Sequence, residues 1–259
     1  MSVRFDVDAH VARVTIDRPE RMNAVDRETE EALNRIWDRI EQDPDIRAVV
    51  LTGTGDRAFS AGADMKAGST SKTGLEYWAE GRENGFGGIA LRNTLDVPVI
   101  ARVNGVAFGG GFEMVLGCDI VVAAEEAQFG LTEPRVGRLA LDGGIALLPR
   151  LMPQKIAMGL LLTGGRLSAA DAAGYGLVNE VVPRADLDAA VDRWLNGLLA
   201  CAPLSAKAIK QMVRRSEGLT AREAQALRTP ALIAALQSED QDEGVRAFRE
   251  KRRPIWKGR

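Results

Sequence analysis

The segment NGVAFGGGFE (Asn104–Glu113) joins a predicted strand at Val97–Val103 to a predicted helix that continues to Leu116. Three consecutive glycines at the start of a helix leave backbone N–H groups without intrahelical partners. The helix dipole adds partial positive charge at the same place, so this helix start is suited to stabilise a developing anion. A tight strand-to-helix joint would need the same glycines for close packing. Both interpretations stay open from this segment alone.

Strands and helices alternate on the N-terminal and C-terminal sides of this segment. Val3–Val7 and Val11–Ile16 alternate apolar and polar residues, which predicts a pair of strands. Asp26 is expected to cap the helix that follows, and buried strands are predicted at Ala48–Leu51 and Asp119–Ala123. The alternation and its glycine-rich joints predict an α/β architecture.

The regions between and after these elements are assigned from their composition. Gly53–Asp64 is expected to be a loop of small residues, Gly68–Gly88 an irregular and mobile stretch, and Ile89–Leu95 a helix. After Gly143 the pattern is mainly helical, with one short strand at Leu177–Val182. Helices are expected to begin at Ser168, Pro203 and Thr220, and the last is expected over Ser238–Arg252. We divide the chain into a sheet-rich core, 1–195, and a helical C-terminal region, 196–259.

Composition excludes several classes of protein. Of 259 residues, 46% are hydrophobic and the net charge is −2, which predicts a globular protein without a basic surface for nucleic acid. Cys118 and Cys201 form no disulfide framework or zinc pattern. The only histidine, His10, lies at a predicted turn, so a Ser-His-Asp triad, a histidine metal site and a metal cofactor are not expected. With no signal core and no membrane-length apolar run, a cytoplasmic location without membrane partners is expected.

Two carboxylates lie in positions that suit acid–base chemistry. Glu113 falls in the first turn of the glycine-rich helix, where a glutamate is often only a dipole partner. Glu133 precedes Pro134 in a loop, where a glutamate is usually solvated. The small-residue loop Phe59–Asp64 lets a ligand approach backbone N–H groups closely. Together these features supply an anion site and two groups that can exchange protons with a substrate.

These residues give the chain a resemblance to the crotonase superfamily, in particular to enoyl-CoA hydratases and carnitinyl-CoA dehydratase-like members. It covers the chain from about Val11 to the C-terminus. The motifs that match in order and spacing are Arg18–Ala24, Phe59–Asp64, Val103–Glu113, Cys118–Asp119, Ala127–Gly130, Leu162–Gly164 and Gly176–Asn179. The resemblance implies a spiral of ββα turns, a helical C-terminal trimerisation region, and assembly as a homotrimer or a dimer of trimers.

The resemblance also implies a function for individual residues. The backbone N–H groups of Ala63 and Gly110 would form an oxyanion hole for an acyl-CoA thioester, and Glu113 and Glu133 would act around one water. Hydration of an enoyl-CoA or dehydration of a 3-hydroxyacyl-CoA follows, with no cofactor beyond the coenzyme A of the substrate. The remaining residues implied to contact the substrate or its coenzyme A are Ala61, Asp64, Met65, Lys66, Leu141, Arg21, Phe248 and Lys251. Isomerases, decarboxylases and hydrolases of the same fold, and a non-catalytic acyl-CoA binding protein, are the alternatives.

One run departs from the pattern of typical hydratases, Pro-Gly-Ala-Gly-Gly. The matching residues here are ALDGG, from Ala140 to Gly144, with Leu141 in place of the first glycine. Asp142 adds a third carboxylate. Pointing inward, it would raise the pKa of the two glutamates or meet a polar or cationic acyl group. Pointing outward, it would cap the following helix, and this outward orientation is the one we expect.

Overall fold

A parallel sheet forms the centre of the protein. The computed structural model describes residues 2–66 and 74–259. The six strands of this sheet lie in the order β1 (Val3–Asp8), β2 (Val11–Ile16), β3 (Ala48–Gly53), β5 (Val99–Val103), β7 (Ile120–Ala124) and β10 (Glu180–Val182). Only the β1–β2 pair is antiparallel. The alternating and apolar segments predicted as strands are therefore confirmed, with the last one shortened to Glu180–Val182.

A second sheet of short strands runs beside the first. Its order is β4 (Ala58–Ser60), β6 (Val106–Phe108), β8 (Gln128–Gly130) and β9 (Leu167–Ser168). The first three of these strands each follow a strand of the large sheet in the sequence, so the chain repeats a two-strand unit. After β6 the chain enters α3 (Gly110–Leu116). This repetition places the segments after β4, β6 and β8 next to one another.

Helices cover both faces of the large sheet. Helix α1 (Arg27–Gln42) begins at Asp26, whose side chain accepts a hydrogen bond from the Thr29 N–H at 2.9 Å, as predicted. On α1, Leu33, Trp37 and Ile40 are fully buried and help to form the main core. On the opposite face, α7 (Leu187–Leu199) packs against β3, β5, β7 and β10 and closes a second core. The bounds of the helices between α3 and α7 are α4 (Gly144–Leu151), α5 (Gln154–Thr163) and α6 (Ala169–Gly174).

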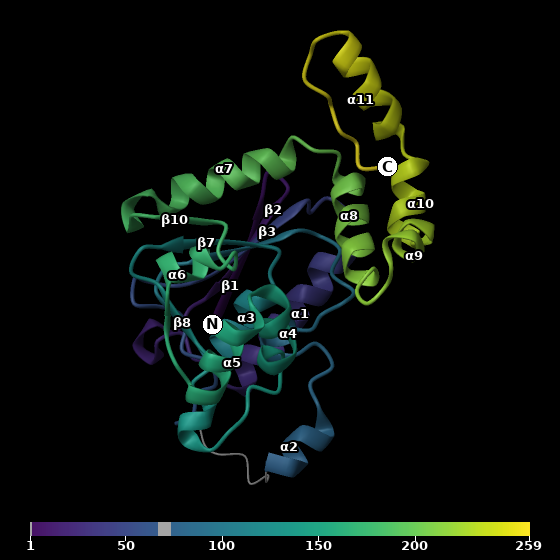
Figure 1. Cartoon of the computed structure of the whole chain (residues 1–259). Coiled ribbons are helices and arrows are strands. Elements are labelled where there is room, and N and C mark those ends of the chain that lie inside the picture. Colours follow the sequence, from purple (N-terminus) through teal and green to yellow (C-terminus); the bar gives the residue numbers. More distant parts are fainter. Residues whose placement is uncertain (1, 67–73) are drawn as a thin grey trace.

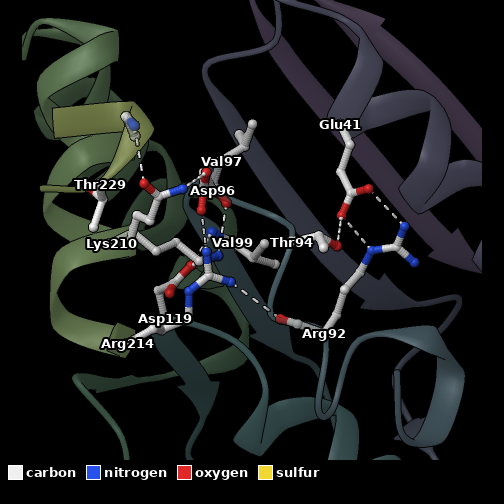
Figure 2. Close-up of polar contacts among 12 residues, drawn as sticks. Glu41, Arg92, Thr94, Asp96, Val97, Val99, Asp119, Lys210, Arg214 and Thr229 are labelled. Atoms are coloured by element: carbon white, nitrogen blue, oxygen red, sulfur yellow. Dashed lines mark hydrogen bonds and ion pairs between the residues drawn. The ribbon is translucent and has the colours of Figure 1, made fainter. Parts of the chain in front are cut away.

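The C-terminal part is helical, as expected from the sequence. It contains α8 (Pro203–Arg215), α9 (Ala221–Ala226), α10 (Pro230–Leu236) and α11 (Glu239–Arg249). Figure 2 shows how α8 is fixed to the core: Lys210 Nζ contacts Asp119 Oδ2 at 2.6 Å, and Arg214 pairs with Asp96. In contrast, α11 stands away from the sheets, at the upper right of Figure 1. The expected boundary at residue 195 falls inside α7, and the division into two domains stays a prediction.

Three expectations about the segment between β3 and β5 are wrong. The loop Gly53–Asp64 contains β4, and residues 74–80 of the stretch expected to be irregular form α2 (Gly74–Glu80). No helix forms at Ile89–Leu95; a short 3-10 turn at Phe86–Gly88 precedes it. Positive φ angles at Gly85, Gly87 and Gly88, of 66°, 62° and 69°, break the helical path there. The expected mobility stays a prediction, and residues 68–73 lie outside the described part of the chain.

Candidate active site

The predicted anion site forms where α3 begins. Gly109 has φ 53° and ψ −129°, a conformation that favours glycine. The N–H of Gly109 is bonded to Gly130 O at 2.8 Å, and Glu113 and Phe112 bond back to Gly109 O. Among residues 2–66 and 74–259, the N–H groups of Ala63 and Gly110 have no hydrogen-bond acceptor. Within this part of the chain, both N–H groups expected to form an oxyanion hole are thus without an internal partner, and their role stays a prediction.

The loop that contains Ala63 lies directly against this helix start. At Gly62, φ is 86°, and a Cβ there would lie 2.7 Å from Phe108 O and 2.9 Å from Gly110 N. No side chain larger than hydrogen fits between the two segments. Backbone hydrogen bonds fix the loop on its other side, because Val25 N donates to Gly62 O and Asp64 N donates to Val25 O. The approach of Gly62 to Gly110 therefore brings the two predicted oxyanion segments together.

Glu113 is buried beside this site, and its side chain is held by the backbone. The residue is 2% exposed, and its Oε1 accepts a hydrogen bond from Gly144 N at 2.9 Å. Burial raises the pKa of Glu113 to about 8, and the charges of Asp142 and Glu133 add to the rise. The Gly144 N–H acts in the opposite direction but does not cancel burial. At neutral pH this carboxyl group therefore holds a proton readily.

Glu133 lies against the backbone turn at Gly109, where α3 begins. It is the first residue of a 3-10 helix, Glu133–Val136. A Cβ on Gly109 would lie 2.9 Å from Glu133 Oε1, so the carboxylate rests against the start of α3. Its Oε2 is buried and has no hydrogen-bond partner among the residues that the structure describes. Burial, and to a lesser extent the charge of Asp142, raises the pKa of Glu133. The two glutamates predicted to work together are thus brought together in the fold.

Asp142 points inward, which contradicts the outward orientation that we expected. It is 8% exposed, and its Oδ2 accepts hydrogen bonds from Tyr77 Oη and from an Arg82 nitrogen, the latter at 2.9 Å. Asp142 does not cap the following helix α4, whose N-cap residue is Gly143 and whose first N–H, that of Gly144, donates to Glu113. As a helix cap, Asp142 would accept a hydrogen bond from one backbone N–H. In the inward orientation it accepts hydrogen bonds from two strong donors, Tyr77 and Arg82. The structure therefore has the inward orientation, in which the charge of Asp142 raises the pKa of both glutamates.

Leu141, which the resemblance implied to contact the substrate, has its N–H bonded within the chain, and its contact with the substrate stays a prediction. Its φ angle lies outside the left-handed region, and its N–H donates to Leu139 O at 3.0 Å. The N–H that contacts the Glu113 carboxyl group is that of Gly144, the second of the two glycines that remain in this run. Gly144 could have been predicted from that glycine pair. Tyr77 and Arg82 carried no sequence signal, since both are about sixty residues from Asp142.

The other residues implied to line the substrate channel lie near the loop of Ala63. Asp64 is paired with Arg18 at 3.0 Å and also accepts the Lys66 N–H at 3.1 Å, so its carboxylate supports the loop. Met65 is 69% exposed and Lys66 is exposed. Burial raises the pKa of Asp64, but the charges of Arg18 and Arg21 lower it. Arg21 therefore lies on the same side of the loop as Asp64. The N–H of Ala61 is bonded to Met22 O at 3.0 Å.

Phe248 and Lys251 are not part of this site within one chain. Phe248 is 85% exposed at the end of α11, and Lys251 follows it with a φ of 53°. Helix α11 extends away from the sheets (Figure 1). Within the described residues there is also no group of three or more histidines, cysteines or acidic residues that could hold a metal ion. No helix in the same part of the chain is long and apolar enough to cross a membrane.

Comparisons with known proteins identify the family of this chain. The profile of the enoyl-CoA hydratase/isomerase family matches residues 6–259. The chain is 40% identical to (E)-benzylidenesuccinyl-CoA hydratase of Thauera aromatica, with 100% of both chains covered. It is 38% identical to carnitinyl-CoA dehydratase of Salmonella typhi, covering 100% of this chain and 99% of the relative.

Solved structures show the same fold. An enoyl-CoA hydratase of Bacillus anthracis superposes with a TM-score of 0.90 at 32% identity, over 100% of both chains. A carnitinyl-CoA hydratase of Mycobacterium avium gives 0.76 at 38% identity, over 100% of this chain and 99% of that one. The chain therefore belongs to the enoyl-CoA hydratase/isomerase family and has the crotonase-like fold that its motifs predicted. It is an enzyme of the hydro-lyase type.

Proposed function

We propose that this enzyme adds water to an enoyl-CoA thioester, or removes it from a 3-hydroxyacyl-CoA, with Glu113 and Glu133 as its catalytic residues. The observation that carries the proposal is the arrangement of the buried Glu113 and half-buried Glu133 carboxyl groups, both with a raised pKa, against the helix start, where the Gly110 N–H has no acceptor among the described residues. Relatives with 38–40% identity over the whole chain are named as a hydratase and a dehydratase of CoA thioesters, which supports the same reaction type.

The mechanism follows from where these groups lie. The thioester carbonyl oxygen accepts hydrogen bonds from the N–H groups of Ala63 and Gly110, which makes the β-carbon electrophilic. The same donors stabilise the enolate that forms when water attacks, and one such donor contributes about 3–4 kcal/mol. Two neighbouring carboxyl groups with raised pKa values hold one proton between them. One therefore takes a proton from the water while the other protonates the α-carbon.

Coenzyme A binding is the second part of the proposal. Ala61 and Ala63–Lys66 are proposed to line the coenzyme A channel, with Arg21 near the nucleotide end. Support comes from the position of this loop, which continues directly from the free Ala63 N–H, and from the exposure of Met65 and Lys66. No other cofactor takes part in this proposal, and a cytoplasmic location and no nucleic-acid partner remain part of it.

We also propose a homotrimer or a dimer of trimers. Helices α8 and α10 expose large apolar side chains, among them Ile209, Val213 and Leu236, and such surface is suited to an interface. In an assembly, the exposed Phe248 and Lys251 on α11 would contact the coenzyme A of a neighbouring chain. Sedimentation should give a mass of three or six chains, and truncation after Ser238 should weaken both assembly and CoA affinity. A monomer in sedimentation would contradict this part of the proposal.

A substrate panel tests the reaction itself. Purified enzyme would be mixed with enoyl-CoA thioesters that differ in chain length and polarity, and the absorbance of the conjugated thioester would be followed. We expect this absorbance to fall as water adds, and the reverse reaction to restore it from the 3-hydroxyacyl-CoA. If no thioester in the panel loses its conjugation, while isomerisation or release of free CoA is detected instead, the hydratase proposal is wrong.

A further inference from the structure

The loop that follows β4 has a bonding partner for each backbone N–H around Ala63, but not for that of Ala63 itself. Within residues 61–64, the first and last N–H groups donate to backbone oxygens of residues 22–25, at 3.0 and 2.9 Å. The N–H of Gly62 donates to a side chain, Ser60 Oγ, at 3.2 Å. In the part of the chain that the structure describes, the Ala63 N–H has no acceptor. The bonds of its neighbours therefore select which N–H the loop offers to a ligand.

Ser60, the last residue of β4, connects this loop to the core. Its side chain is fully buried. The hydroxyl donates to Asn23 O at 2.8 Å, which leaves its lone pairs for the Gly62 N–H. Asn23 is itself firmly held, because its side-chain amide donates to Thr54 O at 2.9 Å and to Ala58 O at 2.8 Å. The Ser60 hydroxyl thus links the Gly62 peptide group to a well-bonded part of the core.

Ser60 also lies against the start of α3. A Cβ on Gly111 would collide with Ser60 O and would lie 2.9 Å from Ser60 Cβ. The residue before it, Gly110, lies against Gly62. Ser60 is therefore in contact with both backbone segments whose N–H groups, those of Ala63 and Gly110, are expected to bind one oxygen atom.

The conformation of Gly62 explains why the loop needs this support. Gly62 is buried and has a φ of 86°, and glycine has the widest conformational freedom of any residue. Without the Ser60 hydroxyl, its N–H would be buried without a partner, which costs free energy. The peptide group would then gain by rotating toward another acceptor. Because Gly62 directly precedes Ala63, such a rotation changes the direction of the Ala63 N–H.

We propose that Ser60 is a positioning residue for the hydration reaction, whose hydroxyl holds Gly62 so that the Ala63 and Gly110 N–H groups converge on the thioester oxygen. This inference rests on the proposed function and adds a residue that the mechanism there does not use. Ser60 acts through Gly62 and takes no part in proton transfer. Its effect falls on kcat more than on KM, because oxyanion donors act most strongly on the charge that develops in the transition state.

Three variants separate positioning from folding. Ser60→Ala removes the hydroxyl, and we expect kcat for the fastest thioester of the substrate panel to fall by about 10–100-fold, with KM within about threefold of wild type. Ser60→Cys offers a weaker acceptor of similar shape and should restore part of kcat. Thr29→Val is the matched control, because Thr29 is also fully buried and its hydroxyl donates to Asp26 Oδ1 at 2.7 Å. It should lose stability in thermal unfolding but keep kcat.

The stretching frequency of the thioester carbonyl reports the oxyanion hydrogen bonds directly, since hydrogen bonds to a carbonyl lower this frequency. Butyryl-CoA, with and without an isotope label at the carbonyl carbon, gives the infrared difference spectrum of the bound carbonyl. Its saturated chain cannot be hydrated, so the wild-type enzyme itself can be measured. We expect the frequency to be lowest in wild type and Thr29→Val, intermediate in Ser60→Cys, and nearest the value of free butyryl-CoA in Ser60→Ala.

Several outcomes would overturn the proposal. Wild-type kcat and carbonyl frequency in Ser60→Ala, or an equal loss of kcat in Thr29→Val, would show that the Ser60 hydroxyl serves folding alone. If Ser60→Ala does not fold, Ser60→Cys decides: a lower kcat with a raised frequency supports positioning, and unchanged values contradict it.

Failure of the proposed function has a different signature. If the wild-type enzyme hydrates no thioester of the panel, the hydratase proposal is wrong, while the frequencies of bound butyryl-CoA still decide the role of Ser60. If the wild-type enzyme leaves the carbonyl frequency at its free value, the proposed oxyanion hole is wrong, and the inference about Ser60 is wrong with it.

Discussion

The candidate active site has two halves, one formed by backbone groups and the other by side chains. The half proposed to bind the thioester carbonyl is made of backbone: Gly62 lies against Gly110, and glycine conformations fix the distance between the two segments. The half proposed to move protons is made of side chains from separate segments: Asp142 acts on Glu113 and Glu133, and Arg82 contacts Asp142. The first half depends on shape and the second on charge.

This difference predicts different responses to substitution. A backbone donor keeps its strength whatever the pH, so only a steric change can disturb it. A buried carboxyl group keeps its position when it is replaced by an amide, but its proton chemistry is lost. Substitutions that preserve shape should therefore damage the side-chain half most, and substitutions that add volume should damage the backbone half most.

The largest effect is expected from the catalytic carboxyl groups. Glu113→Gln and Glu133→Gln preserve the size of each side chain, and the amide oxygen at position 113 can still accept the Gly144 N–H. Each variant should lose hydratase turnover by about 10²–10⁴-fold because a general acid–base group is removed. Affinity for a saturated acyl-CoA, measured by calorimetry, should stay within a few fold of wild type. Turnover near that of wild type in either variant would remove that glutamate from the mechanism.

The next effect concerns the contact between Gly62 and Gly110. In Gly62→Ala, the new Cβ meets Phe108 O at 2.7 Å and Gly110 N at 2.9 Å, at a φ of 86°. The two segments must separate, and kcat should fall by about 100-fold as oxyanion stabilisation weakens.

Gly137→Ala is the matched control for this substitution. Gly137 has a φ of 70°, and a Cβ there meets nothing within 4 Å. Only backbone strain is added, so thermal unfolding should report a loss of about 1 kcal/mol with kcat almost unchanged. If both variants lose the same activity, strain rather than the Gly62–Gly110 approach controls the site.

A third effect concerns stability against pH. The pKa of Glu113 is raised to about 8 by burial first and by Asp142 and Glu133 second, whereas in the unfolded chain it returns to its ordinary lower value. At pH values between the unfolded pKa and about 8, the folded state binds one proton more than the unfolded state does. The stability that Glu113 contributes is therefore fully present below the unfolded pKa and is lost as the pH rises through about 8.

Glu113→Gln removes the titrating carboxyl group and tests whether the free energy of unfolding falls as the pH rises. Relative to wild type, the variant should gain free energy of unfolding between about pH 5 and about pH 9, by a few kcal/mol. Denaturant unfolding at several pH values measures the difference. Parallel stability curves for the two proteins would show that Glu113 does not titrate in this range when folded.

A smaller effect is expected on the pH dependence of the reaction in Asp142→Asn. The charge of Asp142 raises the pKa of Glu113 and of Glu133. Its removal should therefore shift the pH profile of kcat/KM for a neutral thioester toward lower pH. An unshifted profile, combined with normal stability, would mean that Arg82 already neutralises Asp142.

The smallest effect should come from Leu141→Gly. The N–H of Leu141 is bonded to Leu139 O, and its φ angle is one that any residue adopts. We expect kcat for a straight-chain thioester within a few fold of wild type, together with a loss of thermal stability of about 1 kcal/mol from the added chain entropy. A large gain in hydration of straight-chain thioesters would instead show that the leucine side chain restricts the acyl pocket.

The sequence alone determined the strands of the large sheet, the cap of α1 by Asp26 and the glycine-rich start of α3, and the motifs of the resemblance singled out Glu113 and Glu133. These features depend on local periodicity, on capping groups and on motifs of a few residues, which neighbouring positions specify. Gly144 was recoverable in principle, because the glycine pair of its run is visible in the sequence.

Only the tertiary structure decided the orientation of Asp142, the failure of a helix at Ile89–Leu95, and the pKa of Glu113. Asp142 could have capped α4, but Tyr77 and Arg82 meet it from α2 and the segment after it, far away in the sequence. Residues 89 and 90 are apolar because they fill the core from an irregular segment that follows three positive-φ glycines. Burial and the field of neighbouring charges depend on which segments lie together in space, and no local pattern contains that information.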